Sequence, residues 1–189
     1  LKLKYDSLLP EEINSYEGHL ILTTYKETPE ISQKPMLHEE IIDKDPVVIQ
    51  GLMIQKLQVG LEKNELVLGI DPGLRTGLSV FYYGQEIERS FFTSIEKLVM
   101  HIAKILAELR ADRKIVKIGN GNMSIAKEIT ELLNLRFCSD FELEFVDESR
   151  TSLKVKNYNQ RGKRDMMSAK YITQREGPRH FILPLSRTG

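Results

Sequence analysis

An aspartate ends an apolar run in the middle of the chain, where its carboxylate is placed to do chemistry. The run Leu66–Ile70 has the composition of a buried strand, Asp71 follows it, and Pro72-Gly73 breaks the chain directly afterwards. A carboxylate at a strand end is only partly desolvated, and a metal ion, a phosphate contact or a charged partner offsets the cost of that burial. Asp71 is therefore the first candidate ligand.

Two further acidic sites stand at expected element ends. The apolar segment 141–146 runs into Asp147 and Glu148, and Asp165 heads an expected helix whose face also carries Ser168, Ala169 and Ile172. Each site has an ordinary alternative. The first fits a polar strand end that enters a loop, and Asp165 fits a first-turn acid favoured by the helix dipole.

Acids at sheet ends can converge, because ligands of such sheets generally bind in the crevices beyond the strand ends. Converging carboxylates repel one another unless a divalent cation holds them, and Mg²⁺ or Mn²⁺ prefers oxygen ligands. Sites of this kind cleave phosphodiester bonds, since one ion activates water and another stabilises the leaving oxygen.

A basic segment, residues 150–164, joins the second and third acidic sites. It carries six Lys or Arg residues and no acid. Beside a metal site it would bind the phosphate backbone of a nucleic acid, whereas as a solvated surface loop it would have no such role. Both interpretations stay open. The six residues are Arg150, Lys154, Lys156, Arg161, Lys163 and Arg164.

Periodicity predicts the elements that must position these residues. The order is strand, strand, strand, helix, strand, helix, strand, helix, which is typical of an α/β fold with a mixed sheet of about five strands flanked by helices. Thr93 is expected to cap the first of these helices, Ser124 the second, and Gly84-Gln85 to form a hairpin turn. The expected strands are 66–70, 78–83, 86–92, 115–118 and 141–146, and the expected helices are 95–109, 124–133 and 165–175.

The chain is expected to hold two parts, a small N-terminal α+β appendage at 1–65 and the main domain at 66–189. Residues 1–65 carry 7 Lys or Arg and 12 Asp or Glu, whereas residues 66–189 carry 20 and 15, so the main domain is the better partner for an anion. In the appendage we expect a strand at 19–25 and a helix from Pro46. The helix face would carry Ile49, Leu52, Met53, Leu57 and Leu61.

Composition excludes several classes of protein. Cys138 is the only cysteine, so neither an intrachain disulfide nor a cysteine zinc cluster can form. No apolar run approaches the ~18 residues of a membrane span, and no signal-peptide pattern opens the chain, which begins with Leu1. A cytoplasmic location without membrane partners is the expectation, and a homodimer stays open.

Four short motifs resemble those of the RuvC/YqgF group of ribonuclease-H-like nucleases, and they follow one another in the same order as in that group. They fit YqgF and the YqgF-like domain of the Tex proteins better than RuvC. The segment around Asp71 resembles the first-strand motif, and the segment ending in Asn120 is similar to the Gly-Asn-Gly strand end of the Tex domain. Residues 146–152 resemble the YqgF motif in which Glu precedes Arg and Thr. Residues 164–170 resemble the last-helix motif with its acid.

The resemblance implies a ribonuclease H-like fold and a Mg²⁺- or Mn²⁺-dependent endonuclease that acts on branched or structured DNA or RNA. It assigns Asp71, Glu148 and Asp165 as metal ligands and catalytic residues. Alternation along the strand does not decide between Asp147 and Glu148, and the resemblance selects Glu148. Asn120 and Asp147 are supporting candidates, and Arg75 joins the six basic residues as an expected nucleic-acid contact.

The chain departs from RuvC resolvases in ways that keep other functions open. Asn120 stands where resolvases carry a second acid, and the last helix has a single acid. Holliday-junction resolution and RNA processing are therefore both considered. A ribonuclease-H-like module that binds nucleic acid without cleavage is the alternative from another class. An ATP-binding domain of the sugar-kinase and actin type is a third, although those proteins need two such lobes.

Overall fold

The computed structural model describes residues 4–24, 34–57, 63–136, 141–147, 161–177 and 179–182, without the side chains of 136, 161–165 and 179–182. It divides the chain into two units, Leu1–Glu62 and Lys63–Gly189. Asn64 and Glu65 were expected in the appendage, but they belong to the second unit because of their hydrogen bonds and strand pairing. The carbonyl of Asn64 accepts from the Asp112 N–H at 2.9 Å, and Glu65 begins a strand.

The first unit contains a short parallel sheet and one α-helix. Strand β1 (Ile21–Thr23) pairs with β2 (Met36–His38), 3-10 helices lie at Pro10–Glu12 and Glu39–Ile41, and α1 spans Pro46–Leu57. The expected apolar face of α1 is wrong, because Val48, Gly51 and Ile54 are the buried residues. These positions are spaced by three, so they lie along one side of the helix.

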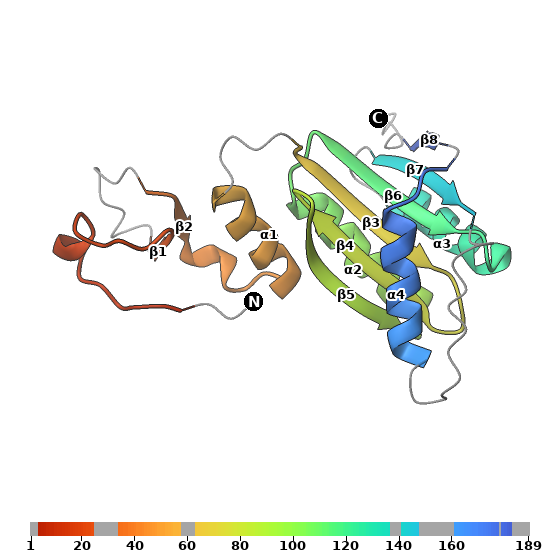
Figure 1. Cartoon of the computed structure of the whole chain (residues 1–189), viewed down its shortest axis with the longest axis horizontal. Coiled ribbons are helices and arrows are strands. Elements are labelled where there is room, and N and C mark those ends of the chain that lie inside the picture. The colour runs from red at the N-terminus through yellow and green to blue at the C-terminus, as the bar shows by residue number, and fades with distance from the viewer. Residues whose placement is uncertain are drawn as a thin grey trace. The chain divides into compact units, whose positions relative to one another are not determined.

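The second unit is built on a six-stranded mixed sheet in the order β5-β4-β3-β6-β7-β8 (Figure 1). Strands β3, β6 and β7 are parallel, β4 and β5 extend the sheet as antiparallel neighbours on one side, and β8 is antiparallel to β7. The α/β architecture with a mixed sheet is therefore confirmed, and β8 adds a strand that the sequence did not predict. The bounds are β3 Glu65–Asp71, β4 Thr76–Tyr82, β5 Gln85–Phe92, β6 Arg113–Gly119, β7 Phe141–Val146 and β8 Arg179–Ile182.

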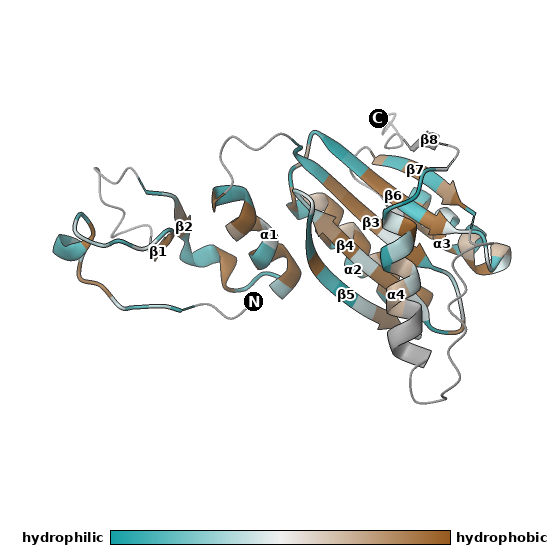
Figure 2. Cartoon of the chain, viewed as in Figure 1, coloured by the Kyte–Doolittle hydropathy of each residue, from teal (hydrophilic) through white to brown (hydrophobic). Residues whose placement is uncertain are grey.

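Helices cover both faces of this sheet. Helices α2 (Ile95–Glu108) and α3 (Met123–Arg136) lie behind it in Figure 1, and α4 (Arg161–Thr173) crosses its front. Brown bands lie along the middle of the strands in Figure 2, and the apolar residues on the α2 side form a continuous aliphatic core. They include Leu66, Leu68, Ile70, Leu78, Val80, Val116 and Ile118. Within the part of the chain that the structure describes, no helix is long and apolar enough to cross a membrane.

Three local expectations need correction, and side-chain chemistry explains each. Ser94, not Thr93, caps α2 by accepting from the Lys97 N–H at 3.3 Å. Asn122 replaces Ser124 at the start of α3, where its Oδ1 accepts from Ile125. The hairpin turn consists of Tyr83 and Gly84 rather than Gly84 and Gln85. Both residues have positive φ, which is required in a two-residue turn whose twist matches that of the strands.

Arg113 joins the three parallel strands at their amino ends. Its guanidinium donates to Glu65 on β3 at 2.7 Å and to both carboxylate oxygens of Glu142 on β7 at 2.9 Å. These hydrogen bonds and charges, those of Glu142 first, raise the pKa of Arg113. Bidentate pairing of this kind is the stronger form of ion pair.

We expect Arg113→Met to lower the free energy of unfolding by about 1–3 kcal/mol, because the buried Glu142 carboxylate loses its donors. Thermal denaturation followed by circular dichroism measures the change. Arg110→Met is the matched control, since Arg110 is exposed. Equal melting temperatures for the two variants would contradict a structural role for this ion pair.

Candidate metal centre at the carboxyl ends of the parallel strands

The three parallel strands end at one edge of the sheet, and the sequence places polar residues there. Strand β3 ends at Asp71, β6 at Gly119 and β7 at Val146, with Asn120 and Asp147 directly after the last two. Parallel pairing aligns these ends, as Ile70 pairs with Ile118 and Gly119 with Val146. The strand ends that carry Asp71, Asn120 and Asp147 therefore lie at one edge of the sheet.

Asp71 stands between two residues that have no side chain. On β4 its partner is Gly77, and the parallel register continued by one residue from Ile70 and Ile118 sets Gly119 on the other side. Glycine within a strand commonly marks the close approach of a ligand or of another backbone. The half-buried Asp71 thus has neighbours without side chains on both adjacent strands.

Helix α4 packs on the face of the sheet to which Asp71 belongs. A Cβ at Gly69, two residues before Asp71, would lie 2.3 Å from the carbonyl oxygen of Ala169 and 2.5 Å from a methyl carbon of Thr173. Only glycine permits so close an approach of helix to strand. In Figure 1 the first turn of α4 lies toward the end of the sheet where β3 ends.

Asp165 lies one turn before Ala169 on this helix. Ser168, Ala169 and Ile172 are buried, so the predicted inward face is confirmed for these three residues. The helix begins at Arg161 and has no acid in its first turn, so the reading of Asp165 as a first-turn acid favoured by the dipole is wrong. Its side chain lies outside the described part of the structure.

Three hydrogen bonds hold the chain where it leaves β7. The Asn120 N–H donates to the carbonyl of Val146 at 3.0 Å, and the Asn120 amide donates to Asp147 Oδ1 at 3.5 Å. The guanidinium of Arg175, just after α4, donates to the carbonyl of Asp147 at 2.7 Å. Asp147 is exposed and takes part in the structure of this edge.

Alternation of side chains along β7 places Asp147 on the side of the sheet opposite to α4. Glu144 forms an ion pair with Lys117, whose ammonium donates to the carbonyl of Arg175, so even-numbered positions of β7 face α4. Asp147 has the opposite parity, which it shares along its own strand with Leu143 and Phe145. Glu148 has the parity of Glu144, and it lies outside the described residues.

A polar row that the sequence did not reveal lies beneath α4. Cross-strand register aligns Arg89, Ser79, Gly69, Lys117 and Glu144 on this face. Lys117 and Glu144 are 7% and 0% exposed and pair at 3.2 Å, so each charge offsets the burial of the other. The sequence did carry a sign of this row, because Glu142 and Glu144 occupy alternate positions of β7. Such acids are unusual in a strand that is covered on both faces.

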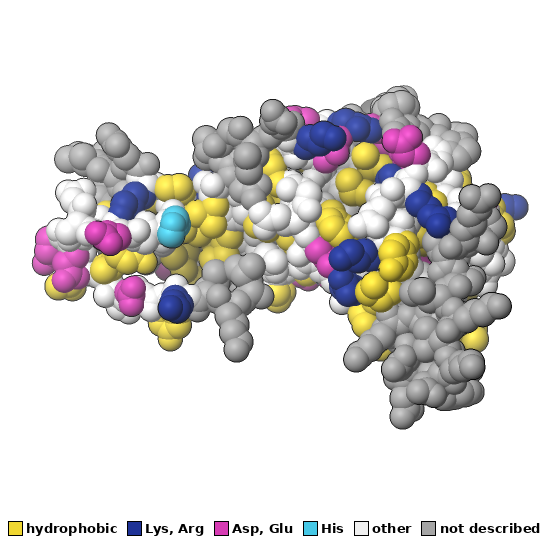
Figure 3. Space-filling model, in the orientation of Figure 1, with side chains coloured by type: hydrophobic (Ala, Val, Ile, Leu, Met, Phe, Trp, Pro, Cys, Tyr) yellow, Lys and Arg dark blue, Asp and Glu magenta, His cyan; other side chains and the backbone are white. Residues whose placement is uncertain are grey.

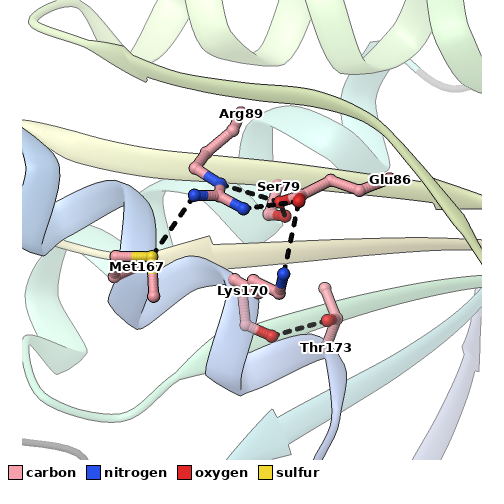
Figure 4. A network of polar contacts seen from close by, with 6 residues as sticks. All are labelled: Ser79, Glu86, Arg89, Met167, Lys170 and Thr173. Atoms are coloured by element: carbon pink, nitrogen blue, oxygen red, sulfur yellow. Dashed lines mark hydrogen bonds and ion pairs between the residues drawn. The ribbon is translucent and has the colours of Figure 1, made fainter.

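At the β5 end of this row, Glu86 joins β5 to α4 (Figure 4). It accepts from Arg89 at 2.8 Å, from Ser79 at 3.2 Å and from Lys170 of α4 at 3.4 Å, and Arg89 also contacts the sulfur of Met167. The hydrogen bond from Arg89 is the main cause that lowers the pKa of Glu86. Ionised Glu86 therefore stabilises the folded state. This stabilisation is complete at pH values above the ordinary carboxyl pKa, and it is lost as the pH falls through the lowered pKa.

The structure describes the side chains of only some of the predicted site residues. Arg75 is exposed in the turn after Asp71, and its guanidinium lies 5.5 Å from the centre of the Phe91 ring. Among the described residues, no group of three His, Cys, Asp or Glu side chains is placed to hold a metal ion. The remaining predicted contacts lie outside the described side chains: Glu148, Asp165, Arg150, Lys154, Lys156, Arg161, Lys163 and Arg164.

The sequence matches no protein-family model, and it has no significant match among curated proteins. Function is therefore inferred from the residues and the geometry at the carboxyl edge of the sheet.

Proposed function

We propose that this protein is a Mg²⁺- or Mn²⁺-dependent endonuclease with a ribonuclease H-like fold, which hydrolyses phosphodiester bonds in branched or structured nucleic acid. One observation carries the proposal. Asp71 ends strand β3 between two glycines, on the face of the sheet that α4 covers. The YqgF-like order of the sequence motifs supports the same assignment.

The donor set suits a hard divalent cation. Asp71, Glu148 and Asp165 would hold it through carboxylate oxygens, and Gly77 adds no side chain beside Asp71. When bound, such ions activate water and stabilise the leaving oxygen of a phosphodiester. Arg175 and Asn120 position the chain just before Glu148 through their hydrogen bonds to Asp147 and Val146. The basic segment 150–164 would bind the flanking phosphates.

Two other functions remain as alternatives. A binding module without turnover is favoured by Asn120, because an amide replaces the acid that resolvases carry at that strand end. An ATP-binding domain of the actin type needs two matching lobes. The described part of the chain has one six-stranded sheet and one two-stranded sheet, which supports the nuclease over that alternative.

The direct test offers the purified protein a branched DNA, an RNA–DNA hybrid and a structured RNA, each with Mn²⁺ and with EDTA. We expect Mn²⁺-dependent cleavage of at least one substrate. Binding of these substrates without any cleavage would instead establish the binding module.

Glu148 and Asp147 are expected to respond differently to the loss of charge. Glu148→Gln should weaken Mn²⁺ binding and abolish cleavage with little change in melting temperature, because it removes a ligand. Asp147→Asn should mainly lower the melting temperature, because Asp147 bonds to Asn120 and faces away from α4. Isothermal titration with Mn²⁺ and thermal melts of both variants measure the two effects, and the reverse pattern would overturn the assignment.

The basic segment is expected to set the salt dependence of binding. Replacing Lys154, Lys156, Arg161 and Lys163 with alanine should weaken duplex DNA binding and flatten its dependence on salt. Each lost phosphate contact should remove about 0.9 from the magnitude of the slope of log K against log salt. Fluorescence anisotropy over a salt series measures that slope, and an unchanged slope would contradict phosphate binding by this segment.

A further inference from the structure

An exposed aromatic side chain lies on the same sheet row as Asp71. Phe91 on β5 is 43% exposed, although the next residue along the strand, Phe92, is half-buried against His101 with the rings 5.4 Å apart. The guanidinium of the exposed Arg75 lies 5.5 Å from the centre of the Phe91 ring. An exposed ring with a cation stacked on it has the composition of surfaces that stack nucleobases.

Register places this ring close to the candidate metal centre. Asp71 pairs with Gly77, and Gly77 pairs with Phe91, so all three residues point to the α4 face of the sheet. Two interstrand steps of about 4.8 Å separate Asp71 from Phe91. Gly77 contributes no side chain between them, and a single nucleotide can span this distance with its phosphate at a metal ion bound by Asp71 and its base at Phe91.

Packing gives Phe91 no comparable structural role. Phe81, which faces α4 from the neighbouring strand β4, also has a cation over its ring, that of Lys170 at 5.9 Å, but Lys170 belongs to α4 and the ring is half-buried. Phe91 instead lies on an edge strand, where an exposed apolar side chain invites unwanted pairing. Hydrophobic and basic side chains adjoin on the face that Figure 3 shows.

We propose that Phe91 and Arg75 form a nucleobase-stacking site that receives the base next to the phosphate that a metal ion at Asp71 would bind. The location of that phosphate rests on the proposed nuclease function, whereas the stacking requires neither metal nor cleavage. The ligand is an unpaired base of DNA or RNA, as found at branch points and strand ends, because a base within a duplex is already stacked.

The chain contains no tryptophan, so Phe91→Trp introduces a single fluorophore at the site. We expect its emission to be quenched by a short single-stranded DNA and by the matching RNA in EDTA, and to be unaffected by an abasic strand of the same length. Quenching by the abasic strand as well, or by none of the three, would overturn the proposal.

Binding of the same single strand in EDTA supplies the second readout. Phe91→Ala should weaken it about tenfold, whereas Met100→Ala, which truncates a similarly exposed apolar residue on α2, should leave it unchanged. Equal affinities for the two variants would also overturn the proposal. If Phe91→Ala weakens binding but the protein cleaves no substrate with Mn²⁺, the stacking site stands and the nuclease function fails.

Discussion

Asp71→Asn is expected to abolish Mn²⁺-dependent cleavage while the protein stays folded and still binds nucleic acid. The substitution keeps the shape of the side chain but removes the negative charge that a divalent ion requires. The loss should exceed the roughly 10- to 100-fold effect of changing residues that only orient a metal ligand. Initial cleavage rates at saturating Mn²⁺ measure it, and circular dichroism verifies the fold.

Asp112→Asn is the matched control. Asp112 begins the turn into β6 at the opposite edge of the same sheet, where its carboxylate accepts from the Asn64 amide at 3.2 Å. It should keep full activity. Equal activity of the two variants would show that the carboxyl edge is not the reactive edge of the sheet.

Gly69→Ala is expected to cause the largest loss of stability. The new Cβ would meet the backbone carbonyl of Ala169 at 2.3 Å, and a backbone atom in the middle of a helix cannot turn aside. Overpacking of this kind costs about 1–3 kcal/mol or more, and relief requires α4 to move off the sheet. Denaturant unfolding measures the loss, and cleavage should fall because the proposed site takes Asp165 from α4.

Gly73→Ala controls for the loss of glycine itself. Gly73 lies in the turn after Asp71, and a Cβ there would be 3.2 Å from the carbonyl oxygen of Arg75, which a small shift of the turn relieves. Its cost should be well below that of Gly69→Ala. Equal costs would contradict the close packing of α4 on β3.

Elements with a strong period could be predicted from the sequence, whereas their ends depended on single side chains. Helix α2, predicted at 95–109, spans Ile95–Glu108. Its cap moved by one residue, because Ser94 and Thr93 are equally good acceptors and only the backbone geometry selects Ser94. Helix α4 begins at Arg161, four residues before the predicted start. Its first turn is polar, so no apolar periodicity marks it in the sequence.

The sequence could identify Asp71 but not the surroundings that make it a plausible ligand. Gly77 lies beside Asp71 through the pairing of β3 with β4, and such registers are not visible in a linear sequence. Glu144 is buried because Lys117 from the neighbouring strand pairs with it, and that pairing is also not visible in a linear sequence. Tertiary pairing of this kind overrides the ordinary preference of charged residues for the surface.

Crystals soaked in Mn²⁺ test the central claim most directly, because the anomalous signal of manganese locates the ion without any assumption about substrate. The proposed function predicts Mn²⁺ bound by carboxylate oxygens of Asp71, Glu148 and Asp165, and loss of that signal in Asp71→Asn crystals. Absence of the ion from this edge at saturating Mn²⁺, or its binding only at other residues, would contradict the assignment of a metal-dependent nuclease.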